Sequence, residues 1–493
     1  MLYNSTRDNQ NTVTPQNAVL KGIADDGGLY ILKDIESLEF DWKETLKKDT
    51  FGIAIDVLSF LLPDYGKDEM TDLVFKAYNG KFESNELTPT VKVGDDYILE
   101  LFRGPTSAFK DVALSMLPQL VISAKKHAGI TDDIVILTAT SGDTGKAALE
   151  GFHDVNGTKI IVFYPDGGVS QIQKAQMVTQ KGNNVFVCAV KGNFDDAQTG
   201  VKNIFDKVSA DGLLQCKNAM LSSANSINIG RLAPQVVYYF KSYSDLLKKG
   251  EIRPYESVNF VVPTGNFGDI LAGYFAKLMG LPVAKLVCAS NKNNVLTDFF
   301  ESGVYNRNRE FFKTNSPSMD ILVSSNLERL LYLLSDGNDK ETAGYMNDLK
   351  TNGTYTVSEK IKDKLNELFF AGYCDDKKTA ETIKKVYEKY GYLCDTHTAV
   401  GYSVMEEFKK NADNGLKTVV LSTASPYKFS KSVLSALGED TDQDEFKIMR
   451  ELNKLTGVSI PKNLESLENE KVLHTDVIEK GEMLDYVLKK VAE

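Results

Sequence analysis

The chain has 493 residues, of which 42% are hydrophobic and 25% are charged. These values are ordinary for a soluble globular protein and exclude disorder as the main state; the length suits about three domains or one large enzyme with several lobes. The formal net charge is −11 at pH 7, from 68 acidic and 57 basic residues. A nucleic-acid or anionic-membrane binder needs a basic surface, so we expect neither partner.

Cysteine and histidine patterns indicate a reduced protein without a metal site. None of the cysteines forms a C-x-x-C pair, and the four histidines form no H-E-x-x-H motif, so we expect neither disulfides nor zinc. The N-terminal MLYNSTRDNQ lacks the apolar core of a secretion signal, and no run of 18 apolar residues occurs. We therefore expect a cytoplasmic protein. The cysteines are Cys188, Cys216, Cys288, Cys374 and Cys394.

The first 95 residues are expected to be mostly helical with turns. A helical apolar pattern over residues 43–62 ends at Pro63. Two apolar runs on either side of Gly94-Asp95-Asp96 predict a short hairpin.

From residue 97 onward, strand and helix patterns alternate, which predicts α/β architecture with mostly parallel sheets. Strands are expected over 97–102, 133–138, 159–164, 184–190, 258–262, 284–289 and 418–422. The helices between them are expected over 109–126, 146–153, 169–181, 195–208, 231–248 and 270–279. Residues 293–395 are richer in charge, with helices expected over 320–334, 358–371 and 377–390. Residues beyond 431 are charged and predicted to form a docked helical tail.

Three glycine- or serine-rich loops stand where a strand gives way to a helix, at residues 141–145, 222–230 and 265–269. Such loops offer free backbone N–H groups, and the helix dipole favours an anion. Ordinary βα turns carry the same residue types, so each loop alone is ambiguous. Three of them, one followed directly by Arg231, favour ligand binding.

Nucleotide motifs do not fit these loops. A phosphate-binding G-x-x-x-x-G-K-[ST] motif would need Gly at position 140 and Ser or Thr at 147, where the chain has Thr140 and Ala147. No G-x-G-x-x-G occurs at 265–270. Nucleotide hydrolysis and NAD-dependent chemistry are therefore disfavoured.

Lys110 follows Phe109 just before a predicted helix, in the segment E-L-F-R-G-P-T-S-A-F-K-D that begins at Glu100. Desolvation there would lower the pKa of the lysine and free its amine to attack a carbonyl. The residues alone favour the simpler alternative, a solvated lysine at a helix start.

Several segments together resemble the threonine synthase family, in its longer microbial and fungal branch. G-P-T-S-A-F-K-D at 104–111 resembles the family's pyridoxal-phosphate lysine motif, T-S-G-D-T-G-K-A-A at 140–148 its substrate loop, and P-T-G-N-F-G-D at 263–269 its cofactor-phosphate loop. Y-N-S-T-R at 3–7, A-D-D-G-G-L-Y at 24–30 and D-T-H-T-A-V-G at 395–401 also match, so the resemblance runs from residue 3 to about 430.

The resemblance implies a fold-type II pyridoxal-phosphate enzyme, with two open twisted α/β lobes around the cofactor and an additional N-terminal domain. It places the N-terminal domain at 1–95 and the large cofactor-binding lobe at 96–128 and 230–430, with a helical insertion at about 293–395. The small substrate lobe would be 129–229 and the helical C-terminal tail 431–493.

The resemblance also assigns cofactor roles. Lys110 would bind pyridoxal 5′-phosphate covalently and act as the catalytic base, and the hydroxyl of Thr423 would face the pyridine nitrogen. Asp143 would lie near the cofactor's 3′-oxygen, with helix capping as its alternative, and a strand-end turn is the alternative for Thr423. The remaining cofactor residues would be Gly265, Asn266, Phe267, Gly268 and, at the helix start, Asp269.

The substrate residues implied by the resemblance are Ser141, Gly142, Thr144, Asn225, Ser226 and Arg231. An arginine in the first helical turn opposes the helix dipole, so a bound phosphate explains Arg231 better than a surface role does. His397 is expected to be structural. The implied reaction converts O-phospho-L-homoserine and water to L-threonine and phosphate, in a monomer or homodimer. The alternatives are a phospho-lyase or amino-acid dehydratase of the same fold, or a non-catalytic phosphate-binding protein.

Overall fold

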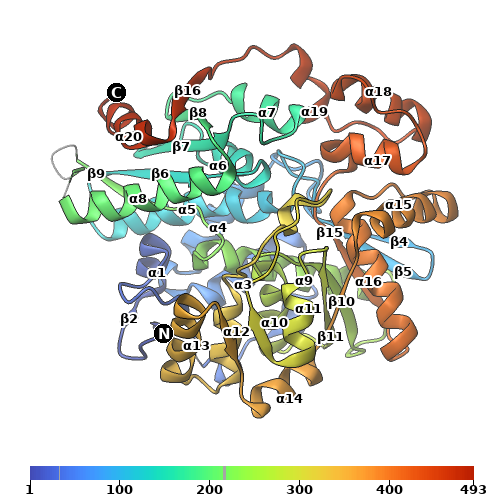
Figure 1. Cartoon of the computed structure of the whole chain (residues 1–493). Helices are drawn as coiled ribbons and strands as arrows, with labels where there is room; N and C mark the ends of the chain where they lie inside the picture. The colour runs from blue at the N-terminus through green and yellow to red at the C-terminus, as the bar shows by residue number, and fades with distance from the viewer. Residues whose placement is uncertain (33, 212, 215–217) are drawn as a thin grey trace.

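The computed structural model describes residues 1–32, 34–211, 213–214 and 218–493. Its framework is two separate sheets, a six-stranded sheet and a five-stranded sheet (Figure 1). In spatial order, the six-stranded sheet contains β14 (Phe369–Tyr373), β11 (Val283–Ser290), β10 (Val258–Pro263), β15 (Thr418–Ser422), β5 (Asp96–Glu100) and β4 (Thr90–Val93). All neighbours in it are parallel except the β4–β5 hairpin, which confirms the hairpin predicted around Gly94.

The five-stranded sheet is entirely parallel. Its strands, in spatial order, are β16 (Asp476–Glu479), β8 (Val185–Lys191), β7 (Thr158–Pro165), β6 (Asp133–Ala139) and β9 (Ala219–Ser222). Central strands such as β7 and β10 are nearly continuous apolar runs that are buried along most of their length, as expected where helices cover both faces of a parallel sheet. The prediction of mostly parallel α/β architecture is therefore confirmed.

The helices pack around and between these sheets. The helices before residue 250 are α1 (Pro15–Lys21), α2 (Trp42–Thr45), α3 (Thr50–Leu61), α4 (Lys67–Tyr78), α5 (Lys110–His127), α6 (Asp143–Phe152), α7 (Gln171–Val178), α8 (Phe194–Asp211) and α9 (Ile229–Lys248). The helices after residue 250 are α10 (Gly268–Leu278), α11 (Val295–Ser302), α12 (Leu327–Leu334), α13 (Asp339–Thr351), α14 (Glu359–Leu368), α15 (Asp376–Tyr390), α16 (Thr396–Ala412), α17 (Ser430–Ala436), α18 (Glu445–Thr456), α19 (Lys462–Glu465) and α20 (Met483–Ala492).

Helices α5 and α9 form the centre of the molecule. They pack against each other, and α5 also packs on α6 while α9 packs on α3 and α10. Almost every residue of α9 is buried, which is the pattern of a helix surrounded by other elements rather than lying on a surface. Because both helices begin near the carboxyl ends of strands, their first turns bring Lys110 and Arg231 to the same region.

The N-terminal region contains a small sheet, formed by β1 (Tyr3–Ser5), β2 (Thr12–Val13) and β3 (Tyr30–Ile31), beside the expected helices. It is tied to α12 by an ion pair between Arg7 and Glu328, with 2.8 Å between Nη2 and Oε2. Tyr3 donates a hydrogen bond to the backbone oxygen of Leu61 at 2.9 Å. The region thus packs on the α/β core rather than standing apart from it.

Two helix predictions in the 293–395 region are partly wrong. The predicted helix over 320–334 begins only at Leu327, because the Asp320 carboxylate instead accepts hydrogen bonds from Thr314 and Asn291 in an irregular segment. The predicted helix over 358–371 ends at Leu368, and the next five residues form β14 at the sheet edge. An additional two-stranded pair joins β12 (Val304–Asn306) and β13 (Thr354–Thr356).

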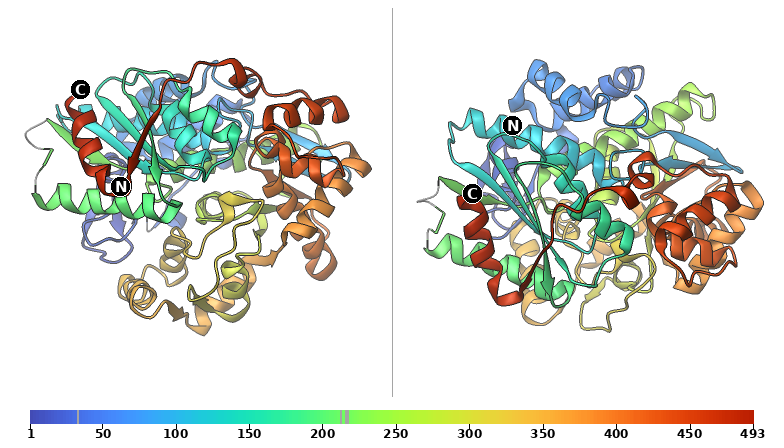
Figure 2. Two further views of the ribbon diagram at one scale, coloured as in Figure 1. Left: turned by 45° about the horizontal axis from the view of Figure 1, so that its top comes forward. Right: turned by 90° about the horizontal axis from the view of Figure 1, so that it is seen from above.

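The C-terminal part is not a purely helical tail. After α18 the chain crosses over α7 to the opposite side of the molecule, where β16 joins the edge of the five-stranded sheet and α20 packs on α8 (Figures 1 and 2). In the described part of the chain, no helix is long and apolar enough to cross a membrane. Four of the five cysteines are free and buried, and Cys216 lies outside the described residues.

Candidate active site

Lys110 is the first residue of α5, and its side chain is buried. Its Nζ lies 4.0 Å from Oδ2 of Asp143 and 4.5 Å from the centre of the Phe109 ring. Burial lowers the pKa of Lys110 to about 8, against the raising effect of the Asp143 carboxylate. Lys110 is therefore desolvated, and the solvated alternative that the residues alone favour is wrong.

The loop before Lys110, residues 104–109, is fixed by hydrogen bonds. Asp111 accepts a hydrogen bond at 2.9 Å from the backbone N–H of Thr106, and burial raises the pKa of Asp111 to about 6. The N–H of Phe109 donates to the backbone oxygen of Thr423 at 2.8 Å. Thr423 is buried at the end of β15, so the predicted cofactor residue Thr423 and the lysine loop are direct neighbours.

Asp143, the first residue of α6, lies between two lysines. Its Oδ1 is 2.8 Å from Nζ of Lys428 and accepts a hydrogen bond from Gln173 at 3.0 Å. Burial alone would raise the pKa of Asp143, but the ammonium groups of Lys428 and Lys110 overcome that effect and hold the pKa well below its usual range. Asp143 is thus a carboxylate that stays ionised, and its side chain serves an ion-pair network rather than capping its own helix.

The loop at residues 265–269 forms an amide cradle at the start of α10. Phe267 adopts a left-handed conformation, with φ of 64°, immediately before the first helical residue, Gly268. A left-handed residue in such a turn directs successive N–H groups toward one point, and those of the first helical turn have no acceptor within the helix. A Cβ added to Gly268 would lie 3.5 Å from Nδ2 of Asn326, an ordinary van der Waals contact, so packing within the protein does not require glycine at this position.

Asp269 points away from that cradle. Its Oδ1 accepts hydrogen bonds from the hydroxyls of Tyr238 and Tyr239, at 2.5 Å and 3.1 Å, and burial raises its pKa to about 6. Its Oδ2 has no hydrogen-bond partner among the described residues. The Asp269 carboxylate is therefore held by two hydroxyls of α9 and not by the amides of the cradle, which explains how an acidic residue can stand beside an anion site.

Arg231 lies in the first turn of α9 and is only 2% exposed. One Nη donates to the backbone oxygen of Ala224 at 2.8 Å, whereas the buried Nε has no hydrogen-bond partner among the described residues. In that same part of the chain, no carboxylate lies within 4.0 Å of it, and burial lowers its pKa to about 10. A buried guanidinium without an anion is costly, so this geometry fits a bound anionic ligand.

Asn326 and Ser318 bring the predicted loops together. The side-chain amide of Asn326 donates to the backbone oxygens of Ser226, at 3.2 Å, and of Asn266, at 3.1 Å. The Ser318 hydroxyl lies 3.5 Å from Oδ2 of Asp143. A Cβ on Gly265 would lie only 2.7 Å from the backbone oxygen of Ser318, so Ser318 also packs against the loop at Gly265. All three loops singled out in the sequence therefore converge on one site.

The remaining residues that the resemblance assigns to substrate binding lie at the edge of this site. Gly142 is buried, Thr144 and Ser226 are half-buried, and Ser141 and Asn225 are exposed. The loop holding Gly142 is closed by the Thr140 hydroxyl, which accepts hydrogen bonds from the N–H groups of Gly142 and Gly145, both at 2.9 Å. The exposed side chains are free to contact a ligand.

His397 is structural, as expected, and supports the loop above the site. Its Nδ1 lies 2.7 Å from the Asp395 carboxylate, and its Nε2 accepts a hydrogen bond from the N–H of Ser318 at 3.1 Å. Because Nε2 accepts this bond, the proton of the neutral ring is on Nδ1. The His397 ring thereby holds Ser318 against Asp143.

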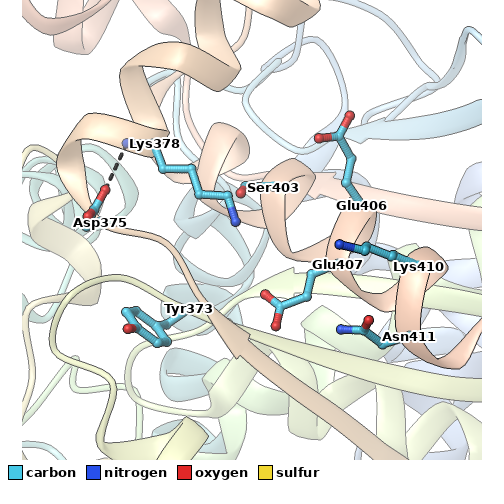
Figure 3. A pocket seen from close by; sticks show the side chains of 8 residues that line it. All are labelled: Tyr373, Asp375, Lys378, Ser403, Glu406, Glu407, Lys410 and Asn411. Carbon is cyan, nitrogen blue, oxygen red and sulfur yellow. Dashed lines mark hydrogen bonds between the residues drawn. The ribbon is translucent and has the colours of Figure 1, made fainter.

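A surface pocket of about 530 Å³ lies elsewhere, at the outer edge of the six-stranded sheet (Figure 3). Its lining comes from the end of β14 and from α15 and α16, including Tyr373, Lys378 and Lys410. It contains none of the predicted site residues. Among the described residues, no group of three or more His, Cys, Asp or Glu side chains is placed to hold a metal ion.

Three family models match the chain in order. "Threonine synthase N terminus" matches residues 2–78, "Pyridoxal-phosphate dependent enzyme" matches residues 82–424, and "Threonine synthase, C-terminal" matches residues 398–478. The chain belongs to the threonine synthase family. Its pyridoxal-phosphate dependence and its fold-type II architecture follow from that membership, so the predicted family, fold class, cofactor and threonine synthase function are confirmed.

Individual members of the threonine synthase family are similar over nearly the whole chain. Threonine synthase of Schizosaccharomyces pombe is 38% identical over 471 residues, covering 89% of this chain and 90% of that protein. The enzyme of Saccharomyces cerevisiae is 37% identical over 500 residues, covering 95% of each. A crystal structure of pyridoxal-phosphate-bound threonine synthase from Brucella melitensis superposes with a TM-score of 0.88, 35% identity and full coverage of both chains.

Three contributors to the site were missed in the sequence: Lys428, Ser318 and Asn326. Lys428 had a usable signal, because it follows Thr423 in the same strand-end loop, where open α/β sheets place ligand-binding residues. Asn326 lies in the irregular part of the segment for which the sequence predicts a helix, 320–334, and Ser318 lies just before that segment, in a 3-10 turn over Pro317–Met319. Their roles depend on how that segment folds over the cradle, which no local pattern reveals.

Proposed function

We propose that the enzyme converts O-phospho-L-homoserine and water to L-threonine and phosphate. The observation that carries this proposal is the presence of two separate features suited to anions in one site: the amide cradle at Gly268, and the buried guanidinium of Arg231, which has no carboxylate partner among the described residues. The cofactor has one phosphate and needs one of them. The second is explained by a substrate that carries its own phosphate.

The residues around the cradle fit pyridoxal phosphate. The amides of Gly265, Asn266, Phe267 and Gly268 would hold its phosphate, where the absent side chain at Gly268 leaves room for close approach. Lys110 would bind the cofactor covalently, and the Thr423 hydroxyl would meet the ring nitrogen. Bound there, pyridoxal phosphate supplies an electron sink that makes a substrate carbon acid accessible to a base.

Lys110 is the base in this proposal, because its amine would become free once the substrate amine took its place on the cofactor. Because burial lowers the pKa of its amine to about 8, Nζ can accept a proton from Cα of the substrate near neutral pH and then move protons at the adjacent carbons. Asp143 and Lys428 form a charge pair beside that amine, which would orient Nζ, and Asp143 would lie near the cofactor's 3′-oxygen. Arg231, with Ser226 and Asn225, would bind the substrate phosphate until it leaves from Cγ.

We also propose that the units predicted from the sequence act as lobes, with residues 129–229 forming a small substrate lobe against the large cofactor lobe. The placement of β6 to β9 in a sheet separate from the six-stranded one supports this division, and β16 of the C-terminal part joins that same sheet. A monomer or homodimer in the cytoplasm is the expected setting. Light scattering of the purified protein distinguishes these two assemblies from larger ones.

The decisive experiment incubates the holoenzyme with O-phospho-L-homoserine and measures phosphate and amino-acid products. Equal amounts of phosphate and L-threonine support the proposal. Phosphate with 2-oxobutyrate indicates the phospho-lyase alternative, and turnover of serine or threonine in preference to the phosphorylated substrate indicates the dehydratase. Lys110→Ala is expected to abolish covalent cofactor attachment and nearly all turnover. Arg231→Ala is expected to raise KM without changing cofactor content, and unchanged kinetics would exclude it as the phosphate ligand.

A further inference from the structure

The segment between α18 and β16 passes directly over the loop that carries Lys110. We call residues 457–475 the C-terminal strap; it includes the short helix α19 and runs along the top of the molecule in Figure 1. Asn463, in α19, is the strap residue that reaches the lysine loop. The proposed reaction assigns no function to the strap, so the contact between Asn463 and the lysine loop is not yet explained.

Asn463 uses both ends of its amide on the lysine loop. Its Nδ2 donates to the backbone oxygen of Pro105 at 2.6 Å, and its Oδ1 accepts a hydrogen bond from the Ser107 hydroxyl at 3.0 Å. A donor and an acceptor on one rigid planar group fit asparagine, whereas aspartate would lose the donor and alanine would lose both bonds. The pair therefore fixes the position of Pro105 relative to Ser107.

Ser107 has an unfavourable backbone conformation in that loop. It is 1% exposed and has a φ of 58°, a left-handed conformation that is unfavourable for a residue with a side chain. Its backbone oxygen accepts from the N–H of Ser425 at 3.1 Å, and its hydroxyl is the one that reaches Asn463. The β15 side of the loop is held by backbone bonds, and the strap side is held by the Asn463 amide.

The strap itself is anchored at both of its ends. Near its start, the Asn453 side chain of α18 donates to the backbone oxygen of Val458 at 2.7 Å, and Leu464 is fully buried beside Asn463. Near its far end, the N–H of Leu473 donates to the backbone oxygen of Val178 in α7 at 2.8 Å. Asn463 is thus held against the lysine loop by a segment that is hydrogen-bonded to α18 near one end and to α7 near the other.

We propose that Asn463 is a positioning residue of the active site: its two hydrogen bonds let the C-terminal strap fix the loop that presents Lys110. Asn463 does not touch the reacting atoms and acts only through Pro105 and Ser107. The inference rests on the proposed role of Lys110 as the cofactor-binding base. A base displaced by a fraction of an ångström loses alignment with the substrate carbon, so the expected deficit is in kcat and not in KM.

The test compares Asn463→Ala with Asn469→Ala, a matched change on the same strap at an exposed side chain. In the cofactor-free protein, amide hydrogen exchange over residues 104–110 is expected to accelerate about tenfold or more in Asn463→Ala and to stay unchanged in Asn469→Ala. In the holoenzyme, kcat should fall about tenfold at constant KM in Asn463→Ala only. Unchanged exchange in the loop together with unchanged kcat would overturn the proposal.

Variants that change the same contact more mildly keep the test informative if Asn463→Ala folds poorly. Ser107→Ala removes one of the two bonds without altering the strap, and Asn463→Asp removes only the donor to Pro105. In a double-mutant cycle, Ser107→Ala should add little to the kcat loss of Asn463→Ala, because both act through the same contact. Fully additive losses would show that the two residues act independently and would overturn the proposal.

These readouts separate the two levels of inference. If Lys110 is not the cofactor lysine, Lys110→Ala retains borohydride-fixed pyridoxal phosphate, whatever happens at Asn463. If Lys110 is correct and the strap plays no positioning role, Lys110→Ala loses that label while Asn463→Ala matches Asn469→Ala in loop exchange and in kcat.

Discussion

The loops at Asp143 and Asp269 have the same local design and opposite electrostatics. Each follows a parallel strand, contains glycine, and places an aspartate in the first turn of a helix. Asp143 faces two ammonium groups, which keep its pKa well below the ordinary value, whereas Asp269 faces two phenols, and burial raises its pKa to about 6. The charge state of a carboxylate at a helix start is therefore decided by distant segments that pack against it.

That difference matches the two tasks proposed for the loops. An ionised Asp143 pairs with the buried Lys428 and lies beside the Lys110 amine, in a place where an unpaired ammonium would be costly. Asp269, whose carboxylate is held by two tyrosine hydroxyls, leaves the amides of the cradle available to a phosphate. Substitutions in the two loops should accordingly behave differently, and the following predictions test that contrast.

The largest effect is expected for Asp143→Asn. Removing the carboxylate leaves the buried Lys428 ammonium without its counter-charge, which should cost about 3–5 kcal/mol of unfolding free energy at pH 7. Because the folded pKa of Asp143 is depressed, its stabilisation is present above its unfolded pKa and is lost as the pH falls toward the folded value. Urea unfolding of the cofactor-free protein should thus show a deficit that shrinks in acid, and a constant deficit would contradict the ion-pair assignment.

Asp269→Asn should show the opposite pH dependence. The folded pKa of about 6 lies above the unfolded value of 3.8, so the wild-type carboxyl destabilises the fold progressively as the pH rises through 6. Relative to wild type, the variant should gain about 2 kcal/mol between pH 4 and pH 8. Measuring both pH values cancels the constant cost of the new amide. No change in relative stability would show that Asp269 titrates normally.

Glycine substitutions separate a structural loop from a binding loop. Gly142 has a φ of 141°, and an added Cβ would lie 2.4 Å from the Gln173 amide, so Gly142→Ala should lower stability by about 2 kcal/mol or more. Gly268→Ala meets only ordinary contacts, so it should fold with near-normal stability. Its methyl group would enter the amide cradle and weaken the binding of pyridoxal phosphate. Titration of the cofactor-free protein with pyridoxal phosphate measures this affinity. Normal cofactor affinity in Gly268→Ala would place the phosphate elsewhere.

The smallest effect on stability is expected for Ser141→Ala. Its side chain is exposed at the tip of its loop, so unfolding free energy should change by less than about 0.5 kcal/mol. If Ser141 binds substrate as predicted, KM should rise while the melting temperature stays the same. An unchanged KM would remove Ser141 from the substrate loop's contacts.

Local sequence patterns predicted the framework well because the framework depends on local properties. Buried parallel strands such as β15 are short apolar runs, and its predicted bounds, 418–422, agree with the structure. The loops at the strand ends were recognisable from glycine and serine alone. The assignment of Lys110 needed the family resemblance, since a lysine before a helix is usually solvated and nothing local shows that this one is buried.

What the sequence could not provide depends on contacts between distant segments. Lys428 pairs with Asp143 across 285 positions, and Asn326 joins loops that lie 100 and 60 positions away. The segment around Asp320 has helical periodicity, yet hydrogen bonds from Asn291 and Thr314 hold it in an irregular conformation. In each case tertiary contacts overrode or added to a local preference.

Strand β16 has a consequence for how the protein is made. Lys191 of β8 pairs with Glu479 of β16, 288 residues further along the chain. During translation, the outer edge of β8 therefore remains open until all of that intervening sequence has left the ribosome, for about half a minute at ordinary elongation rates. An open parallel edge invites pairing with other nascent chains, so we expect newly made molecules to depend on chaperones more than their final stability would suggest.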